Sequence, residues 1–196
     1  MIIYYASQSF YPHIGGVSTY LLNLCTEMVK KGNDVVEVHL RPFGEENIDD
    51  IRGIEIHRVP REPIDKEIMG NYSKFKESIY EECHFNKNKF TKPAHKMEGF
   101  VGFNKVNEYF GEEIRSLLEE KPADIVHIHD PYVPFVGWEI MKKTKSIKVA
   151  TFHSACEKHS IKSIITPYIT LFQDTFSTNF SGAIFVSKIA KKHWQK

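Results

Sequence analysis

The chain has 196 residues, of which 41% are hydrophobic and 26% charged, which is enough apolar material for one sizeable domain and excludes a disordered chain. With 26 basic against 25 acidic residues the net charge is +1, which excludes a generally basic nucleic-acid binder as the first interpretation. The 3 cysteines form neither a disulfide framework nor a metal motif, and no apolar run reaches the ~18–20 residues of a membrane span, so we expect a cytoplasmic domain.

The first half of the chain predicts strands and one helix. Residues 2–5 are a short apolar run that predicts a strand, and the loop after it ends at Gly15 and Gly16. Further strands are predicted over residues 35–40 and 54–59. Between the first two strands, apolar side chains recur at steps of three and four residues, which predicts a helix: Val17, Tyr20, Leu21, Leu24 and Met28.

The middle of the chain has the least regular pattern. A helix is predicted over residues 66–82, and residues 84–105 carry five lysines among phenylalanines. A basic and aromatic stretch of this kind can contact an anionic membrane surface, or it can be a solvated insertion whose aromatic side chains pack on the domain.

The second half alternates strands and helices at regular spacing. The predicted strands cover residues 124–129, 147–153 and 182–186, and the predicted helices cover residues 106–118, 133–143, 163–177 and 187–195. Strands that alternate with helices in this way favour right-handed βαβ units. The sequence therefore predicts an α/β fold with a Rossmann-like open parallel sheet and helices on both faces.

Gly15 and Gly16 form the first candidate site. In such a sheet, ligands bind at the carboxyl ends of the strands, and two glycines before a helix let the backbone come close to a phosphate or a group of sugar hydroxyls. The alternative is a tight turn with a small-residue helix start. The spacing is not the GxGxxG fingerprint of dinucleotide-binding enzymes, so a nicotinamide or flavin enzyme is not expected.

The string His127-Ile128-His129-Asp130 forms the second candidate site. Alternation along a strand places the two histidines on one face, where packed and hydrogen-bonded imidazoles are the expected interpretation, ahead of a metal site. Asp130 follows the strand end and is the candidate functional residue of this group.

His153 and the residues after it form the third candidate site. His153 lies at a strand end, and Ser154 and Lys158 lie on the connection that follows. An imidazole, a hydroxyl and an ammonium at one edge suit a ligand that has hydroxyls and a phosphate, whereas the alternative is a solvated loop. A Ser–His nucleophile is not expected, because no GxSxG elbow is present.

Four stretches taken together resemble the family-4 retaining glycosyltransferases, which have the two-domain GT-B fold, and most of all the phosphatidylinositol mannosyltransferase group. The matching stretches are YPHIGGVSTYLLNL (residues 11–24), DIVHIHDP (124–131), VATFHS (149–154) followed by Lys158, and GAIFVSKIAKKHWQ (182–195). They occur in the family's order and spacing, while residues 60–105 match nothing.

The resemblance implies a role for each matching residue. Gly15 and Gly16 match the loop against the donor's phosphates, and His153 matches a histidine that hydrogen-bonds the donor sugar near its reacting carbon. Asp130 lies where lipid-acceptor members often have an acidic residue, so His153 and Asp130 are the candidate catalytic residues. Lys158 matches a lysine near the acceptor's phosphate, and Ser154 joins it as a candidate acceptor-binding residue. Ser18 departs from the glutamate or glutamine common in the family.

The resemblance also implies what the whole protein would do. We expect residues 1–196 to form the N-terminal, acceptor-side domain of an enzyme that moves a sugar from a nucleotide-diphosphate sugar to a hydroxyl acceptor, such as a phosphorylated polyol or lipid, with retention and without a metal or cofactor. A C-terminal donor-binding domain is expected outside this chain, so the chain alone is expected to be inactive. The alternatives are a non-catalytic sugar- or phosphate-binding half acting with a partner subunit and, more weakly, a nucleotide-sugar epimerase. The expected location is cytoplasmic or peripheral at the inner membrane face, with no nucleic-acid partner.

Overall fold

The fold was analysed in a computed structural model, which describes residues 1–40, 50–59, 111–131, 136–153 and 180–194. Residues 111–120 are helical. The other helices are α1 (Gly16–Lys30), α4 (Val136–Lys143) and α6 (Lys188–Trp194). The strands are β1 (Ile2–Ser7), β2 (Asp34–Leu40), β3 (Asp50–Ile51), β4 (Ile54–Val59), β5 (Ile125–His129), β6 (Ile147–Phe152) and β7 (Gly182–Phe185).

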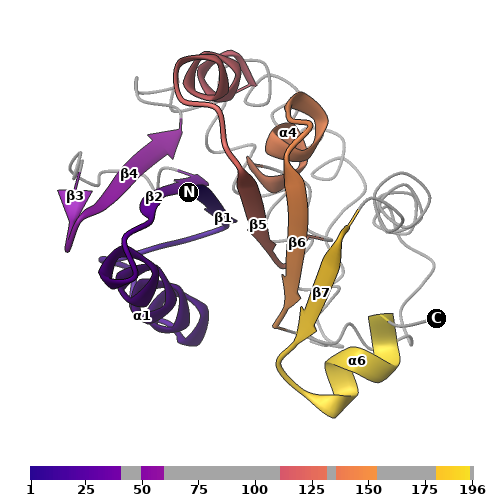
Figure 1. The fold of residues 1–196 in the computed structure, drawn as a ribbon. Helices are drawn as coiled ribbons and strands as arrows, with labels where there is room; N and C mark the ends of the chain where they lie inside the picture. Colours follow the sequence, from indigo (N-terminus) through magenta and orange to yellow (C-terminus); the bar gives the residue numbers. More distant parts are fainter. Residues whose placement is uncertain (41–49, 60–110, 132–135, 154–179, 195–196) are drawn as a thin grey trace, which may run out of the picture.

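The described strands form a seven-stranded sheet in the order β3-β4-β2-β1-β5-β6-β7 (Figure 1). Every neighbouring pair in it is parallel except β3 with β4, which is antiparallel. Sequence analysis missed β3, because two residues are too short to show a pattern. The turn between β3 and β4 uses Arg52 and Gly53, both with φ in the left-handed region (58° and 79°). The predicted α/β fold with a Rossmann-like sheet is confirmed.

Helices cover both faces of the sheet, as predicted (Figure 1). On one face α1 packs through Leu21 and Cys25, which are fully buried against β1, β2 and β4. On the other face the helical residues 111–120 and α4 cover a second core, to which Ile114 and Ile140 belong. Each fully buried aliphatic side chain of this size stabilises the fold by roughly 1.5–3 kcal/mol. The sheet is therefore a rigid layer between two cores, and its strand ends are fixed in position.

α4 lies unusually close to β5 at Gly137. A Cβ atom built on Gly137 would lie 2.7 Å from Cγ2 of Ile128, whereas ordinary contacts begin at 3.4 Å. Only glycine allows this approach. The next residue, Trp138, donates a hydrogen bond from its indole N–H to the carbonyl oxygen of Pro131 (2.7 Å).

Several predictions fall outside the described residues. These are the helices over 66–82 and 163–177, the basic and aromatic segment 84–105, and the candidate acceptor residues Ser154 and Lys158. Among the residues that the structure describes, no helix is both long enough and apolar enough to cross a membrane.

Candidate functional site

The strand order reverses between β1 and β5, so the two halves of the sheet diverge at this point. In open α/β sheets the crevice for a ligand lies there, outside the carboxyl ends of the strands. β1 ends at Ser7, β5 at His129 and β6 at Phe152. The loop to α1, Asp130 and His153 follow these ends, and all of them therefore lie at one edge of the sheet.

Three histidines form a row beneath this edge, which we call the imidazole row: His127, His129 and His153. The ring centroids are 4.5 Å apart for His127 and His129 and 5.1 Å apart for His129 and His153. A hydrogen bond joins Nδ1 of His129 to Nε2 of His153 (2.8 Å), and another joins Nε2 of His127 to Oγ1 of Thr151 (2.7 Å). The expectation that His127 and His129 are packed and hydrogen-bonded is confirmed.

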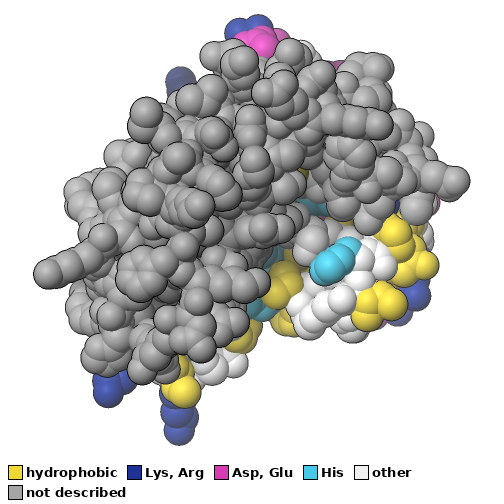
Figure 2. All heavy atoms as spheres, turned by 180° about the vertical axis from the view of Figure 1, so that it is seen from behind, with side chains coloured by type: hydrophobic (Ala, Val, Ile, Leu, Met, Phe, Trp, Pro, Cys, Tyr) yellow, Lys and Arg dark blue, Asp and Glu magenta, His cyan; other side chains and the backbone are white. Residues whose placement is uncertain are grey.

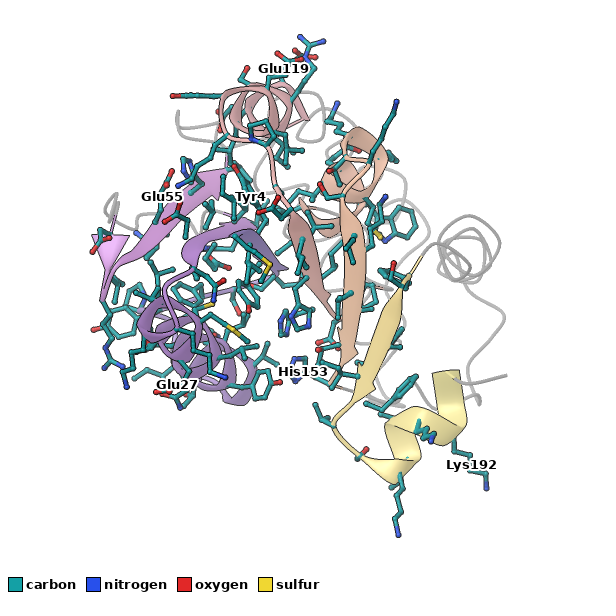
Figure 3. All side chains as sticks on the ribbon, in the orientation of Figure 1. Tyr4, Glu27, Glu55, Glu119, His153 and Lys192 are labelled. Atoms are coloured by element: carbon teal, nitrogen blue, oxygen red, sulfur yellow. The ribbon has the colours of Figure 1, made fainter. Side chains whose placement is uncertain are left out.

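α1 closes the imidazole row from the side. The ring of Tyr20 meets the ring of His153 edge to face, with centroids 5.2 Å apart, and lies 5.9 Å from the ring of His129. Tyr20 stands one helical turn after Gly16, so the start of α1 and His153 come to the same edge. Figure 3 shows His153 at the end of β6, on the side that faces α1. Two of the predicted sites thus meet in the structure.

Burial keeps the imidazole row uncharged. Desolvation lowers the pKa of His127 from 6.5 to about 4, with a smaller contribution from His153. Desolvation also lowers the pKa of His129 well below its ordinary value, and His127 adds to the effect. The pKa of His153 is lowered by desolvation too, although the carboxylate of Asp130 opposes the shift. Neutral imidazoles can donate and accept hydrogen bonds, which suits hydroxyl groups.

Asp130 holds the backbone at the mouth of the sheet. Its φ of 50° lies in the left-handed region, which Asp tolerates better than most residues do. Its N–H donates to the carbonyl of Thr151 (2.8 Å), and its Oδ1 accepts from the N–H of His153 (2.8 Å). One carboxylate oxygen of this candidate catalytic residue therefore fixes His153 in place.

Neither the backbone angles nor the described neighbours of Gly15 and Gly16 require glycine at these positions. Gly15 is extended (φ −169°, ψ 164°), and a Cβ there would meet His13 only at an ordinary 3.8 Å. A Cβ on Gly16 would meet no atom of the described residues within 4 Å, and Gly16 is not among the described glycines with positive φ. No side-chain hydrogen bond caps the helix at Gly15. The open space and the uncapped helix start leave room for a ligand's anionic group.

A second buried polar group, which we call the ion network, lies on the β2 and β4 side: Ser7, Glu37, His39 and Arg58. The Ser7 hydroxyl donates to Oε1 of Glu37 (2.8 Å), and Nδ1 of His39 lies 2.6 Å from Oε2 of the same carboxylate. Nε of Arg58 donates to Nε2 of His39 (3.3 Å), so the imidazole proton is on Nδ1 and goes to Glu37.

The ion network reaches the loop before Gly15. Nη2 of Arg58 donates to the carbonyl oxygen of Tyr11 (3.0 Å), within that loop. Sequence analysis missed this network. The signal was present in Glu37 and His39, which alternate on one face of an otherwise apolar strand, and in Arg58, which the register places opposite His39.

Seen from behind, histidine side chains lie beside hydrophobic ones in the middle of the face, while the lysines and arginines among the described residues lie toward the edges of the view (Figure 2). No group of three or more His, Cys, Asp or Glu side chains within the described residues is arranged to hold a metal ion. The imidazole row is a line of stacked and tilted rings instead of a shell around a point.

No protein-family model matches the sequence, and no curated protein matches it. Solved structures do match. The E. coli trehalose-6-phosphate structure bound with UDP-2-fluoro glucose has a TM-score of 0.64 at 16% identity, covering 100% of this chain and 42% of that one. An alpha,alpha-trehalose 6-phosphate synthase from Burkholderia multivorans gives 0.59 at 12%, covering 99% and 41%. A sucrose-phosphate synthase from Thermosynechococcus elongatus gives 0.52 at 11%, covering 94% and 47%.

At these identities the likeness shows the fold alone. The chain has the Rossmann-like architecture of one half of a GT-B glycosyltransferase and spans less than half of the length of each of these structures. The likeness to the GT-B fold expected from the sequence is confirmed. The narrower assignments to family 4 and to the phosphatidylinositol mannosyltransferase group stay predictions.

Proposed function

We propose that the chain is the acceptor-side domain of a retaining glycosyltransferase of the family-4 type, which transfers a sugar from a nucleotide-diphosphate sugar to a hydroxyl acceptor. The observation that carries the proposal is the contact of Tyr20 with His153, because it brings the open helix start and the imidazole row together at the strand-order reversal. The fold, shared along 94% or more of the chain with structures named for sugar-phosphate synthases, supports it.

In this proposal, the donor's phosphates lie against Gly15 and Gly16. The uncapped N–H groups and the positive end of the α1 dipole suit their charge, and the absent Cβ atoms allow close approach. His153 hydrogen-bonds a hydroxyl of the donor sugar, and Asp130 holds His153 in place. In the family that the sequence resembles, the leaving phosphate takes the acceptor's proton, so the domain needs no nucleophile of its own and acts by positioning and electrostatics.

The acceptor side of the proposal rests on Ser154 and Lys158, which lie outside the described residues. A phosphorylated polyol or lipid would place its phosphate near Lys158, and segment 84–105 would bring the domain to an anionic membrane surface. The donor-binding half would be a second Rossmann-like domain, so the chain alone should transfer no sugar. Product above background from the purified chain, free of any partner, would contradict the need for two halves.

The decisive variant for the phosphate site is Gly16→Ala. The added methyl group enters the space reserved for the ligand. With the donor-binding half present, we expect binding of UDP-glucose by calorimetric titration to weaken at least about tenfold, or ~1.4 kcal/mol. Folding should not suffer, because alanine in a helix is more favourable than glycine by roughly 0.5–1 kcal/mol. Gly182→Ala on β7 is the matched control, since its Cβ also meets nothing within 4 Å, and it should bind like the wild type.

The results of these titrations distinguish the proposed glycosyltransferase domain from a non-catalytic binding subunit. Equal affinities for the wild type and both variants would remove the phosphate role of the helix start. Binding of UDP-glucose without turnover, even in the presence of the donor-binding half, would favour the alternative function of a non-catalytic sugar- or phosphate-binding subunit. No binding of UDP-glucose or of an inositol phosphate by the wild type with the donor-binding half present would overturn both.

A further inference from the structure

We propose that His129 is a positioning residue that sets the tautomer of His153, so that His153 presents its Nδ1–H as a hydrogen-bond donor to the ligand. The inference rests on the proposed function only for the identity of that ligand, a sugar hydroxyl or phosphate oxygen. The tautomer of His153 is set by contacts within this chain and does not depend on which ligand binds.

The first step is the hydrogen bond between the two rings. Nδ1 of His129 and Nε2 of His153 are 2.8 Å apart, so one of them carries the proton and the other accepts it. Both rings are neutral, because burial opposes their charging. Rings face His129 from three elements, Tyr5 on β1, Tyr20 on α1 and His127 on β5, and they bring no opposite charge to it. Two arrangements of the protons are therefore open.

The surroundings of the other ring nitrogen of His129, Nε2, decide between the two arrangements of the protons. His129 is only 1% exposed, and its Nε2 is buried without a hydrogen-bond partner among the residues that the structure describes. If His153 donated to Nδ1, neutral His129 would carry its proton on Nε2, as a buried N–H with no acceptor. Such orphaned N–H groups are rare in folded proteins. The favoured arrangement places the proton of His129 on Nδ1, where it is donated to His153.

The third step follows at His153. Because its Nε2 accepts from His129, neutral His153 carries its own proton on Nδ1, and that nitrogen has no partner among the described residues. An imidazole in water prefers the opposite tautomer, with the proton on Nε2. Asp130, the residue after His129, also holds His153, because its carboxylate accepts a hydrogen bond from the backbone N–H of His153. The end of β5 thus fixes both the backbone and the proton of the histidine on β6.

The test is an NMR measurement on the chain with ¹⁵N-labelled histidine at neutral pH, without any ligand. Long-range ¹H–¹⁵N correlations distinguish the two tautomers of each ring. In the wild type we expect His153 to be protonated on Nδ1. His129→Asn keeps an N–H donor near the position of Nδ1 and should leave His153 in that form. His129→Asp replaces the donor by an acceptor and should place a proton on Nε2 of His153.

A wild-type His153 with its proton on Nε2 would overturn the inference without any variant, which keeps the test valid if His129→Asp does not fold. An Nε2 of His153 that stays without a proton in folded His129→Asp would overturn it as well. Failure of the proposed function would appear differently, as absence of UDP-glucose binding with the donor-binding half present, while the tautomer stays unchanged.

Discussion

The two halves of the sheet each bury a polar group near the strand ends, and the two groups differ in kind. The ion network on β1, β2 and β4 joins a carboxylate, an imidazole and a guanidinium, with Glu37 and His39 0% exposed and Arg58 3% exposed. The imidazole row, on β5 and just after β6, has neutral rings and one buried nitrogen, Nε2 of His129, without a partner in the described part of the chain. One group contains opposite charges that are linked through His39, and the other carries none.

This difference assigns the two groups different tasks. A buried charge is tolerated only when it is paired and hydrogen-bonded, so the members of the ion network depend on one another and on the loop that Arg58 holds. Neutral imidazoles that keep a ring nitrogen available can take up a ligand's hydroxyls without a change of charge. The ion network is therefore structural, and the imidazole row is the part suited to binding.

Breaking the ion network should give the largest effect. Arg58→Met leaves the Glu37 carboxylate buried without its counter-charge, and we expect the free energy of unfolding to fall by about 3–5 kcal/mol in denaturant titrations. Arg115→Met is the matched control, because Arg115 is 55% exposed and should change stability by less than ~0.5 kcal/mol. Combining Arg58→Met with Glu37→Gln should recover part of the loss. A loss no larger than that of the control would refute the dependence.

Acid should act on the imidazole row next most strongly. Above pH 6.5, His127 is neutral in both the folded and the unfolded chain, and it makes no contribution to the pH dependence. As the pH falls from 6.5 to about 4, the unfolded chain binds a proton that the folded chain does not, so stability falls by about 3 kcal/mol through His127.

Measurement of the unfolding free energy between pH 7 and pH 4 checks this sign. His127→Phe should make the profile less steep in that window, and His129 and His153, whose pKa values are also lowered, should keep the remaining slope. His13→Gln, which replaces an exposed histidine, is the control and should keep the wild-type slope. A slope in His127→Phe as steep as in the wild type would show that other groups carry the acid response.

Asp130 should give the smallest effect. Asp130→Ala removes the hydrogen bond to the His153 N–H and places alanine at φ 50°, for an expected loss of about 2 kcal/mol. Asp130→Asn keeps an acceptor oxygen and tolerates the left-handed region, so its thermal unfolding should stay close to that of the wild type. Equal losses in both variants would mean that the charge matters more than the bond.

Sequence analysis predicted most of the fold because helix and strand periods are local. The predicted strand over residues 54–59 matches β4 in full, and the predicted helix beginning near Val17 is α1. It also placed Asp130 and His153 at strand ends, where the structure joins them by a hydrogen bond.

The contacts between elements could not be predicted, because they depend on register. Only the pairing of β2 with β4 brings Arg58 to His39, and only the packing of α1 on the sheet brings Tyr20 to His153. The unpartnered nitrogen of His129 likewise follows from packing on all sides, and no sequence pattern reports it.

The geometry of the candidate site depends on Gly137, which lies in α4 on the face of the sheet opposite to α1. A methyl group there would press on Ile128, and α4 would have to rise from β5. Trp138 would rise with it and draw the Pro131 carbonyl, one residue beyond Asp130. One added carbon atom at Gly137 would thus displace the backbone beside Asp130. The spacing between α4 and β5 therefore helps to set the geometry of the edge where a ligand would bind.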